Sequence, residues 1–442
     1  MKKYFISGAM LAGLMSLAAC SNDEDVVADN NGAEQQFTIT LASSGDRATR
    51  AAADRTLESE AAGQSIEKVT LIVRSQDDGA NKNKVVYIHT LDNWNGTATD
   101  YYTNGHGKEL TFTIPKADKL GEGKYVVTAV GYNEDNYTLS LPNKGDVVDK
   151  NITAITPTGA EAKEVFAGEQ EFTVKDGKIE GTDASKPIQS VDVTLHRQVA
   201  GAYGYFTSIP AKIGKKEVAS IRMVSRSKNT VLTFGSFNSS FTTTDANVMY
   251  MVNGSVPATK TAKFLNGDEA NVLFSAKIAD WFPSGDTNND GVYDKKDTNW
   301  TNPYTIGSYL KGSVFASNFI VPFSATQGKS TLELQLLDAT GNVLYAWPVK
   351  LDASNDQIGK TGETASADLL GAGKAMDFAE TADVFSLFRN HIYSIGIHKQ
   401  DTTNPDKTDP GTDEPTDLSK IQNVVIRVND NWEALHHMSI DE

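Results

Sequence analysis

The sequence predicts an all-β protein: two tandem β-sandwich-like domains with Greek-key-type connections, followed by an extended C-terminal strand. Short runs of alternating apolar residues recur along the chain, separated by clusters of Gly, Asn, Asp and Pro. Stretches with helical periodicity are scarce. Regularly spaced strands with turn signals between them favour sandwiches over helical folds. The clearest strand candidates are residues 69–73, 110–114, 125–130, 191–195, 331–336 and 392–397.

The first twenty residues have the pattern of a lipoprotein export signal. Lys2 and Lys3 precede an apolar run over residues 4–15, and small residues lead into Cys20. The apolar run is shorter than the roughly 20 residues that a membrane-spanning helix needs. We therefore expect cleavage before Cys20, acylation of its thiol and delivery of the precursor to the cell outer membrane. The alternative is an ordinary secretory signal with an incidental cysteine.

Length and composition bound the remaining possibilities. The 442 residues carry a net charge of −16 and a single cysteine, which excludes an internal disulfide. An acidic chain is a poor partner for nucleic acid or anionic lipid. We expect a signal peptide over 1–19, a propeptide over 20–50, domains over 51–210 and 211–399, a linker over 400–419 and a terminal strand segment over 420–442.

The propeptide holds one short strand and a candidate cleavage site. Phe37, Ile39 and Leu41 alternate with threonines. They are followed by a polar segment in which Arg50 precedes Ala51 and two further alanines. An arginine before small residues in a polar loop is accessible to an Arg-specific protease. We take Arg50–Ala51 as the cleavage site and Arg47 as the second choice; the alternative is a plain tether with incidental arginines.

The C-terminal flank holds a second isolated strand. A linker rich in Thr, Asp, Pro and Lys leads to a run in which Val424, Ile426 and Val428 share one strand face, with Trp432 beyond. A single strand does not stay exposed, because its edge groups and its apolar face need a partner. Two hypotheses follow: the strand folds back onto its own domain, or it pairs with a neighbouring molecule.

The two isolated strands together suggest strand exchange. Cleavage after Arg50 would release the strand at Phe37–Leu41 and open a groove in the first domain. The strand at Val424–Val428 of another copy would then fill the groove by β-augmentation. Such an interface is heterologous and does not close, so it propagates into a filament.

One loop has the spacing of a calcium site. Oxygen donors stand at loop positions 1, 3, 5, 9 and 12 of residues 286–297, with a glycine at position 6. Ca²⁺ takes six to eight oxygen ligands, and the glycine permits the sharp turn. The alternative is a solvated turn. The candidate ligands of a structural Ca²⁺ are Asp286, Asn288, Asp290, Val292 through its carbonyl, Asp294 and Asp297.

The chain resembles the fimbrillins of Bacteroidetes, the type V pilins. The resemblance covers the whole chain, and its most specific motif is Arg-Asn-His-Ile-Tyr near the end of the second domain. The motifs that carry it are Gly123–Asn133, Val165–Gly168, Val193–Ala200 and Arg389–Ile395.

The resemblance implies a structural subunit of a cell-surface fimbria. Such a subunit is exported as a lipoprotein, cut by an Arg-specific protease and polymerised by insertion of its C-terminal strand into the next subunit. The retained C-terminal appendage implies a stalk subunit. The implied partners are identical subunits, accessory tip and anchor proteins, and host or bacterial surface receptors, in support of adhesion, colonisation, biofilm formation and virulence.

No catalytic constellation is visible in the sequence, and we expect no enzymatic activity. Paired-histidine zinc motifs, phosphate loops and a cysteine nucleophile are absent from the sequence. The main alternative is a lipid-anchored surface lipoprotein that binds glycan or protein through Trp281, Trp300 and Trp347. A secreted hydrolase with an unrecognised site is the third possibility.

Overall fold

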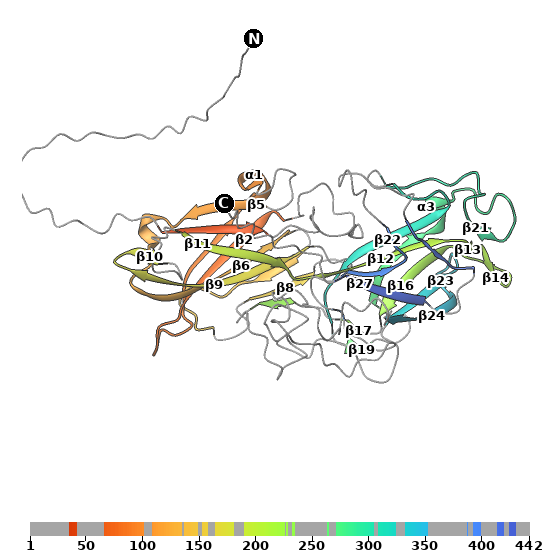
Figure 1. The fold of residues 1–442 in the computed structure, drawn as a ribbon. Coiled ribbons are helices and arrows are strands. Elements are labelled where there is room, and N and C mark those ends of the chain that lie inside the picture. Colours follow the sequence, from red (N-terminus) through yellow and green to blue (C-terminus); the bar gives the residue numbers. More distant parts are fainter. Residues whose placement is uncertain are drawn as a thin grey trace, which may run out of the picture.

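The computed structural model describes parts of both predicted domains and short internal segments of the two flanks. The described residues are 35–41, 66–100, 108–134, 137–148, 153–157, 164–180, 190–225, 227–228, 232–234, 263–264, 271–304, 308–323, 332–351, 387, 392–398, 413–419 and 424–429. The all-β prediction is confirmed, since strands dominate these residues and helices are single turns. Among the described residues, no helix is long and apolar enough to cross a membrane. Figure 1 shows the strands gathered into two groups along an elongated molecule.

The N-terminal group has nine strands in the order β3-β2-β6-β9-β11-β1-β5-β4, with β10 paired to β9. One turn of helix, α1 (Trp94–Thr97), follows β3, and a 3₁₀ turn, η2 (Lys116–Asp118), follows β5. The strands are β1 (Gln36–Leu41), β2 (Lys68–Ser75), β3 (Val85–Leu91), β4 (Thr99–Asp100), β5 (Lys108–Thr113), β6 (Gly123–Tyr132), β9 (Phe166–Lys175), β10 (Lys178–Glu180) and β11 (Ser190–Arg197).

Strand β11 passes from the layer that contains β1 and β5 to the layer that contains β9, β6 and β2. Its first six residues pair with β1, and only His196 and Arg197 pair with β9. This change of layer explains Gly168 on β9, because any side chain there would collide with the carbonyl oxygen of Thr194. Phe37 on β1 and Phe172 on β9 meet edge to face, 5.5 Å between ring centroids, and join the layers.

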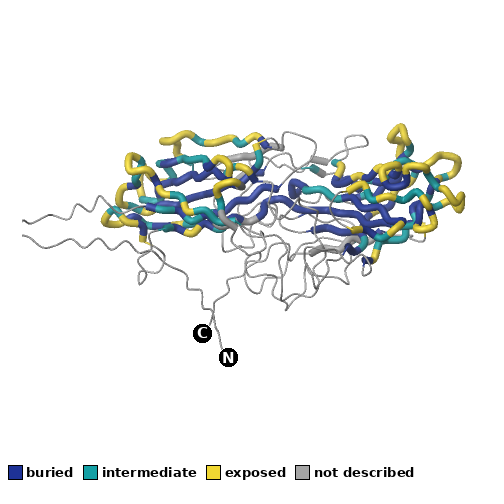
Figure 2. The backbone as a smooth tube through the Cα atoms, turned by 90° about the horizontal axis from the view of Figure 1, so that it is seen from above, coloured by how far each residue is buried: buried dark blue, intermediate teal, exposed yellow. Residues whose placement is uncertain are grey.

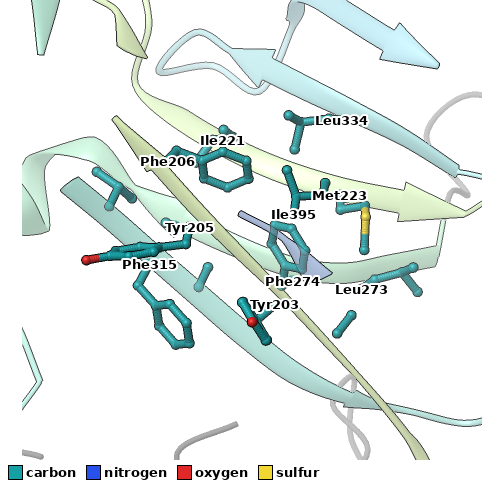
Figure 3. Close-up of a cluster of buried hydrophobic side chains, with 14 of the residues drawn as sticks. Tyr203, Tyr205, Phe206, Ile221, Met223, Leu273, Phe274, Phe315, Leu334 and Ile395 are labelled. Atoms are coloured by element: carbon teal, nitrogen blue, oxygen red, sulfur yellow. The ribbon is translucent and has the colours of Figure 1, made fainter. Parts of the chain in front are cut away.

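The C-terminal group also has nine strands, in the order β20-β16-β23-β24-β27-β25-β12-β22, with β26 paired to β12. Its core is strongly aromatic, and Figure 3 shows Tyr203, Phe206 and Phe274 among the side chains that fill it. The strands are β12 (Ala200–Thr207), β16 (Ser220–Ser225), β20 (Asn271–Lys277), β22 (Ser313–Ile320), β23 (Leu332–Leu337), β24 (Val343–Leu351), β25 (Ile392–Ile395), β26 (Thr416–Asp417) and β27 (Val424–Asn429), with the helical turn α3 (Ile278–Trp281) after β20.

The domain boundary lies earlier than residues 210 and 211, where the sequence placed it. Strand β12 pairs with β22 and β25 and so belongs to the second domain, only two residues after β11 ends at Arg197. Pro210 and Gly214, which suggested a boundary in the sequence, lie instead at short local strand pairings within the second domain. The remaining short strands are β13 (Ile209–Pro210) with β21 (Val292–Tyr293), β14 (Lys212–Ile213) with β15 (Lys216–Glu217), and β17 (Ser227–Lys228) with β19 (Lys263–Phe264).

A small sheet joins the domains, and a buried ion pair lies at the end of the first domain. Strand β8 (Thr153–Pro157) pairs with β7 (Tyr137–Ser140) and with β18 (Leu232–Phe234), which comes from the second half of the chain. At the end of β11, Arg197 donates to Glu164 through Nε at 3.0 Å, and both side chains are buried. Figure 2 shows buried strand segments running through both domains toward this junction.

Candidate functional site: the slot of the first strand

Strand β1 lies in the interior of the first domain, not at an edge. All six of its residues are in register with β11, which runs parallel to it, and with β5, which runs antiparallel. After Leu41, the next residue that the structure describes is Ile66. Removing β1 would therefore leave a slot with unpaired backbone groups on both walls, which a new strand could satisfy.

The inner face of β1 is part of the hydrophobic core. Phe37 and Ile39 are fully buried, as the alternation in the sequence predicted. In register beside them on β11 lie Val191 and Val193, which are also buried. Leu41 stands in register with Leu195. Burying an apolar side chain of this size contributes about 1.5–3 kcal/mol, so the slot strongly favours an occupied state.

The outer face of β1 carries hydrogen bonds between short polar side chains. Thr38 Oγ1 lies 2.8 Å from Ser190 Oγ and 3.2 Å from Thr111 Oγ1. Gln36 Nε2 donates to Thr113 Oγ1 at 3.2 Å. These bonds face water and therefore contribute little net stability, but they mark the side-chain row that faces out of the slot.

Gln35, just before β1, is a buried polar residue that sequence analysis did not single out. Its side chain is fully buried. Its Oε1 accepts a hydrogen bond from Leu120 N at 2.8 Å, and its Nε2 donates to Leu120 O at 2.9 Å and to Gly177 O at 3.3 Å. The sequence signal that could have indicated a buried Gln35 is its place two positions before Phe37, on the same strand face as the apolar residues.

The predicted processing sites lie outside the described residues. This holds for the acylation site Cys20, for Arg47, and for the cleavage pair Arg50 and Ala51. The predicted first strand is confirmed as β1, and the polar segment with the arginines follows it along the chain. A cut in that segment would separate β1 from every other described strand.

The C-terminal strand pairs within its own domain, which is the first of the two hypotheses from the sequence. Strand β27 is in register with β24 over three residues in parallel and with β25 over three residues antiparallel. Val424 is fully buried, and Ile426 and Val428 stand in register with Leu351 and Tyr393. Trp432 lies outside the described residues.

The segment just before β27 is attached to the second domain rather than free. Part of the predicted linker, 413–419, is described: Glu414 forms a two-way backbone bridge with Ile397, and β26 pairs with β12. Asp413 Oδ2 lies 2.8 Å from His398 Nδ1, and both side chains are buried. The His398 ring packs against the rings of Tyr205, Tyr309 and Phe315, and burial raises the pKa of the Tyr205 hydroxyl.

The predicted calcium loop is held by its own hydrogen bonds. Asp286 Oδ2 accepts from Gly291 N at 2.9 Å, and both carboxylate oxygens of Asp297 accept from backbone amides. Lys296 Nζ donates to Asp290 Oδ2 at 2.6 Å and lowers the pKa of that carboxyl. Within the described residues, no group of three or more His, Cys, Asp or Glu side chains is placed to hold a metal ion. Calcium binding stays a prediction.

Calcium, if bound, is expected to raise the melting temperature. At a hundredfold excess over its dissociation constant, a ligand adds about 2.7 kcal/mol of stability. For a domain of this size that is a shift of about 5–10 °C. Thermal melting of the chain with Ca²⁺ and with chelator measures this shift. The double variant Asp290→Asn, Asp294→Asn is expected to show no shift. A melting temperature that neither treatment moves would exclude a stabilising site.

The tryptophans of the glycan-binding alternative do not form an exposed platform. Trp281 and Trp347 are buried. Trp300 is half-buried, and its Nε1 donates to Ser313 O at 2.8 Å. Stacking on a sugar requires an accessible ring face, which Trp281 and Trp347 lack.

Comparison with known proteins adds distant structural neighbours only. No family model and no curated protein matches the chain. Similar solved structures include a presumed adhesin from Bacteroides ovatus (12% identity, TM-score 0.35, covering 83% of this chain and 93% of that one). A second is a presumed polysaccharide-binding protein from Bacteroides thetaiotaomicron (11% identity, TM-score 0.37, covering 82% of this chain and 91% of that one). A third is the fimbrial anchor protein Mfa2 from Porphyromonas gingivalis (10% identity, TM-score 0.35, covering 91% of this chain and 100% of that one). Likeness at this level carries no conclusion about function.

Proposed function

We propose that the chain is a structural subunit, of the stalk type, in a cell-surface fimbria that supports adhesion, colonisation and biofilm formation. It is made as a lipoprotein acylated on Cys20, cut by an Arg-specific protease after Arg50, and polymerised by strand exchange. Its partners are identical subunits, accessory tip and anchor proteins, and surface receptors. No enzymatic activity is part of the proposal.

The observation that carries the proposal is the position of β1. It is an interior strand with two buried apolar side chains, Phe37 and Ile39, yet it is joined to the rest of the domain only through the segment with the candidate cleavage site. A cut there converts a complete domain into one that lacks a core strand. The same chain carries a strand of matching alternation at its C-terminal end.

The pairing pattern favours transfer of the C-terminal strand into the slot. Among the described residues of its own domain, β27 is in register over three residues with each neighbour. In the slot, β1 is in register over six residues with each neighbour. A strand that takes the slot restores the backbone hydrogen bonds that β11 and β5 lose with β1, and this favours its insertion once β1 is gone.

The direct test is the first residue of the chain in the cell-surface polymer. Mass spectrometry is expected to find a chain that begins at Ala51 and carries no lipid, or at Ala48 if Arg47 is used. A surface chain that still begins at acylated Cys20 would rule out the exchange mechanism and favour the lipid-anchored alternative.

A further inference from the structure

Two segments in the flanks of the chain share a pattern of amide and apolar side chains. The segment from Gln35 to Leu41 reads Gln-Gln-Phe-Thr-Ile-Thr-Leu, and the segment from Gln422 to Val428 reads Gln-Asn-Val-Val-Ile-Arg-Val. Both begin with glutamine, continue with an amide side chain and place apolar residues at the third, fifth and seventh positions. In β1 the third and fifth positions are buried, and the first is the buried glutamine.

We propose that residues 422–428 of a second copy occupy the slot in the register of β1, with Gln422 in the place of Gln35. The inference rests on the proposed function and adds the register and the residue that sets it. Val424, Ile426 and Val428 then replace Phe37, Ile39 and Leu41.

The glutamine is what distinguishes this register from the alternatives. A slip by one residue turns the apolar face outward and is excluded by burial. A slip by two residues keeps an apolar face inside, but it withdraws the glutamine side chain from the backbone of Leu120. The buried N–H and C=O of Leu120 then lose the partners that Gln35 supplies at 2.8 and 2.9 Å, and such a loss is costly.

The outer face supports the same register through charge. Thr40 of β1 stands in register with Glu109 of β5. In the proposed register Arg427 takes the position of Thr40, so its guanidinium faces the Glu109 carboxylate across the two strands. An opposite-charge pair in this arrangement is favourable. In its own domain Arg427 stands in register with Ser394, which offers no charge.

The chain allows the register to be read by disulfide trapping. Cys20 is the only cysteine, and maturation removes it, so engineered cysteines react without background. Thr38 Oγ1 and Thr111 Oγ1 lie 3.2 Å apart on the outer face, and Val425 takes the position of Thr38. The precursor chain that starts at Ser21 and carries V425C and T111C is cleaved with an Arg-specific protease, allowed to polymerise and oxidised.

The expected result is a series of covalent oligomers that remain on an SDS gel after heating without reductant. Reductant is expected to convert them to monomers. The matched controls N423C with T111C and R427C with T111C represent slips by two residues and are expected to give at least tenfold less of the cross-linked species. A ladder trapped better by either control would overturn the register while leaving strand exchange intact. Failure of the cysteine-free mature chain to polymerise at all would instead count against the proposed function.

A second measurement isolates the glutamine. Gln422→Leu is expected to slow polymerisation about tenfold or more, because the buried groups of Leu120 stay unpaired. Asn423→Ser, on the outer face, is expected to polymerise like the unaltered chain. Urea denaturation of each monomer before cleavage checks the fold. Equal polymerisation of the Gln422→Leu chain would overturn the role of Gln422.

Discussion

A precursor in which Arg47, Arg50 and Arg55 are all alanine is expected to remain a monomer under conditions where the unaltered precursor forms long polymers. These are the three arginines between β1 and β2. Without a cut, β1 stays in its slot, where the burial of Phe37 and Ile39 alone contributes about 3–6 kcal/mol. The purified chain starting at Ser21 is treated with an Arg-specific protease, and SDS-resistant ladders are measured on gels.

Arg55→Ala alone is the matched control and is expected to polymerise fully, because the predicted site is Arg50. The triple variant keeps its C-terminal strand, so it should still donate that strand to a cleaved chain. Ladders from the triple variant as long as those from the control would show that loss of β1 is not required, and would contradict the account.

Deletion of residues 420–442 is expected to abolish self-polymerisation after cleavage. The deleted chain keeps the slot but has no strand to donate, so in mixtures with intact chains it ends each polymer that it joins. The second domain loses β27 from between β24 and β25, including the buried Val424, and about 2–5 kcal/mol of stability with it. Ladder length as a function of the mixing ratio measures the effect.

Deletion of residues 436–442 only is the control, since it spares β27 and Trp432. This shorter deletion is expected to polymerise normally. Near-ultraviolet circular dichroism and urea denaturation show whether the longer deletion remains folded. A folded 420–442 deletion that forms ladders by itself would rule out the C-terminal strand as the donor.

The strands were predictable because alternation is a local property. The runs at 69–73, 125–130 and 191–195 lie within β2, β6 and β11, and the isolated run at Phe37–Leu41 lies within β1. Burial of alternate side chains on one sheet face imposes this period, so it survives in the sequence. The order of the strands depends on partners far apart in the chain, such as β1 with β11, and the sequence carries no local mark of it.

The domain boundary and the buried Gln35 were missed for specific reasons. Two buried residues, Gln198 and Val199, connect β11 to β12 without the glycine or proline that would mark a boundary. Gln35 is polar and reads as part of a tether until its three hydrogen bonds to Leu120 and Gly177 are seen. The pairing of β27 with its own domain was one of two open hypotheses, because a strand pattern does not name its partner.

The most direct test of strand exchange mixes the two disabled chains. The triple arginine variant can donate a strand but not accept one, and the cleaved 420–442 deletion can accept but not donate. Size-exclusion chromatography with light scattering is expected to find heterodimers and nothing larger, because a heterologous joint between one donor and one acceptor cannot propagate. Longer polymers from this mixture, or no association while unaltered chains polymerise, would contradict the account.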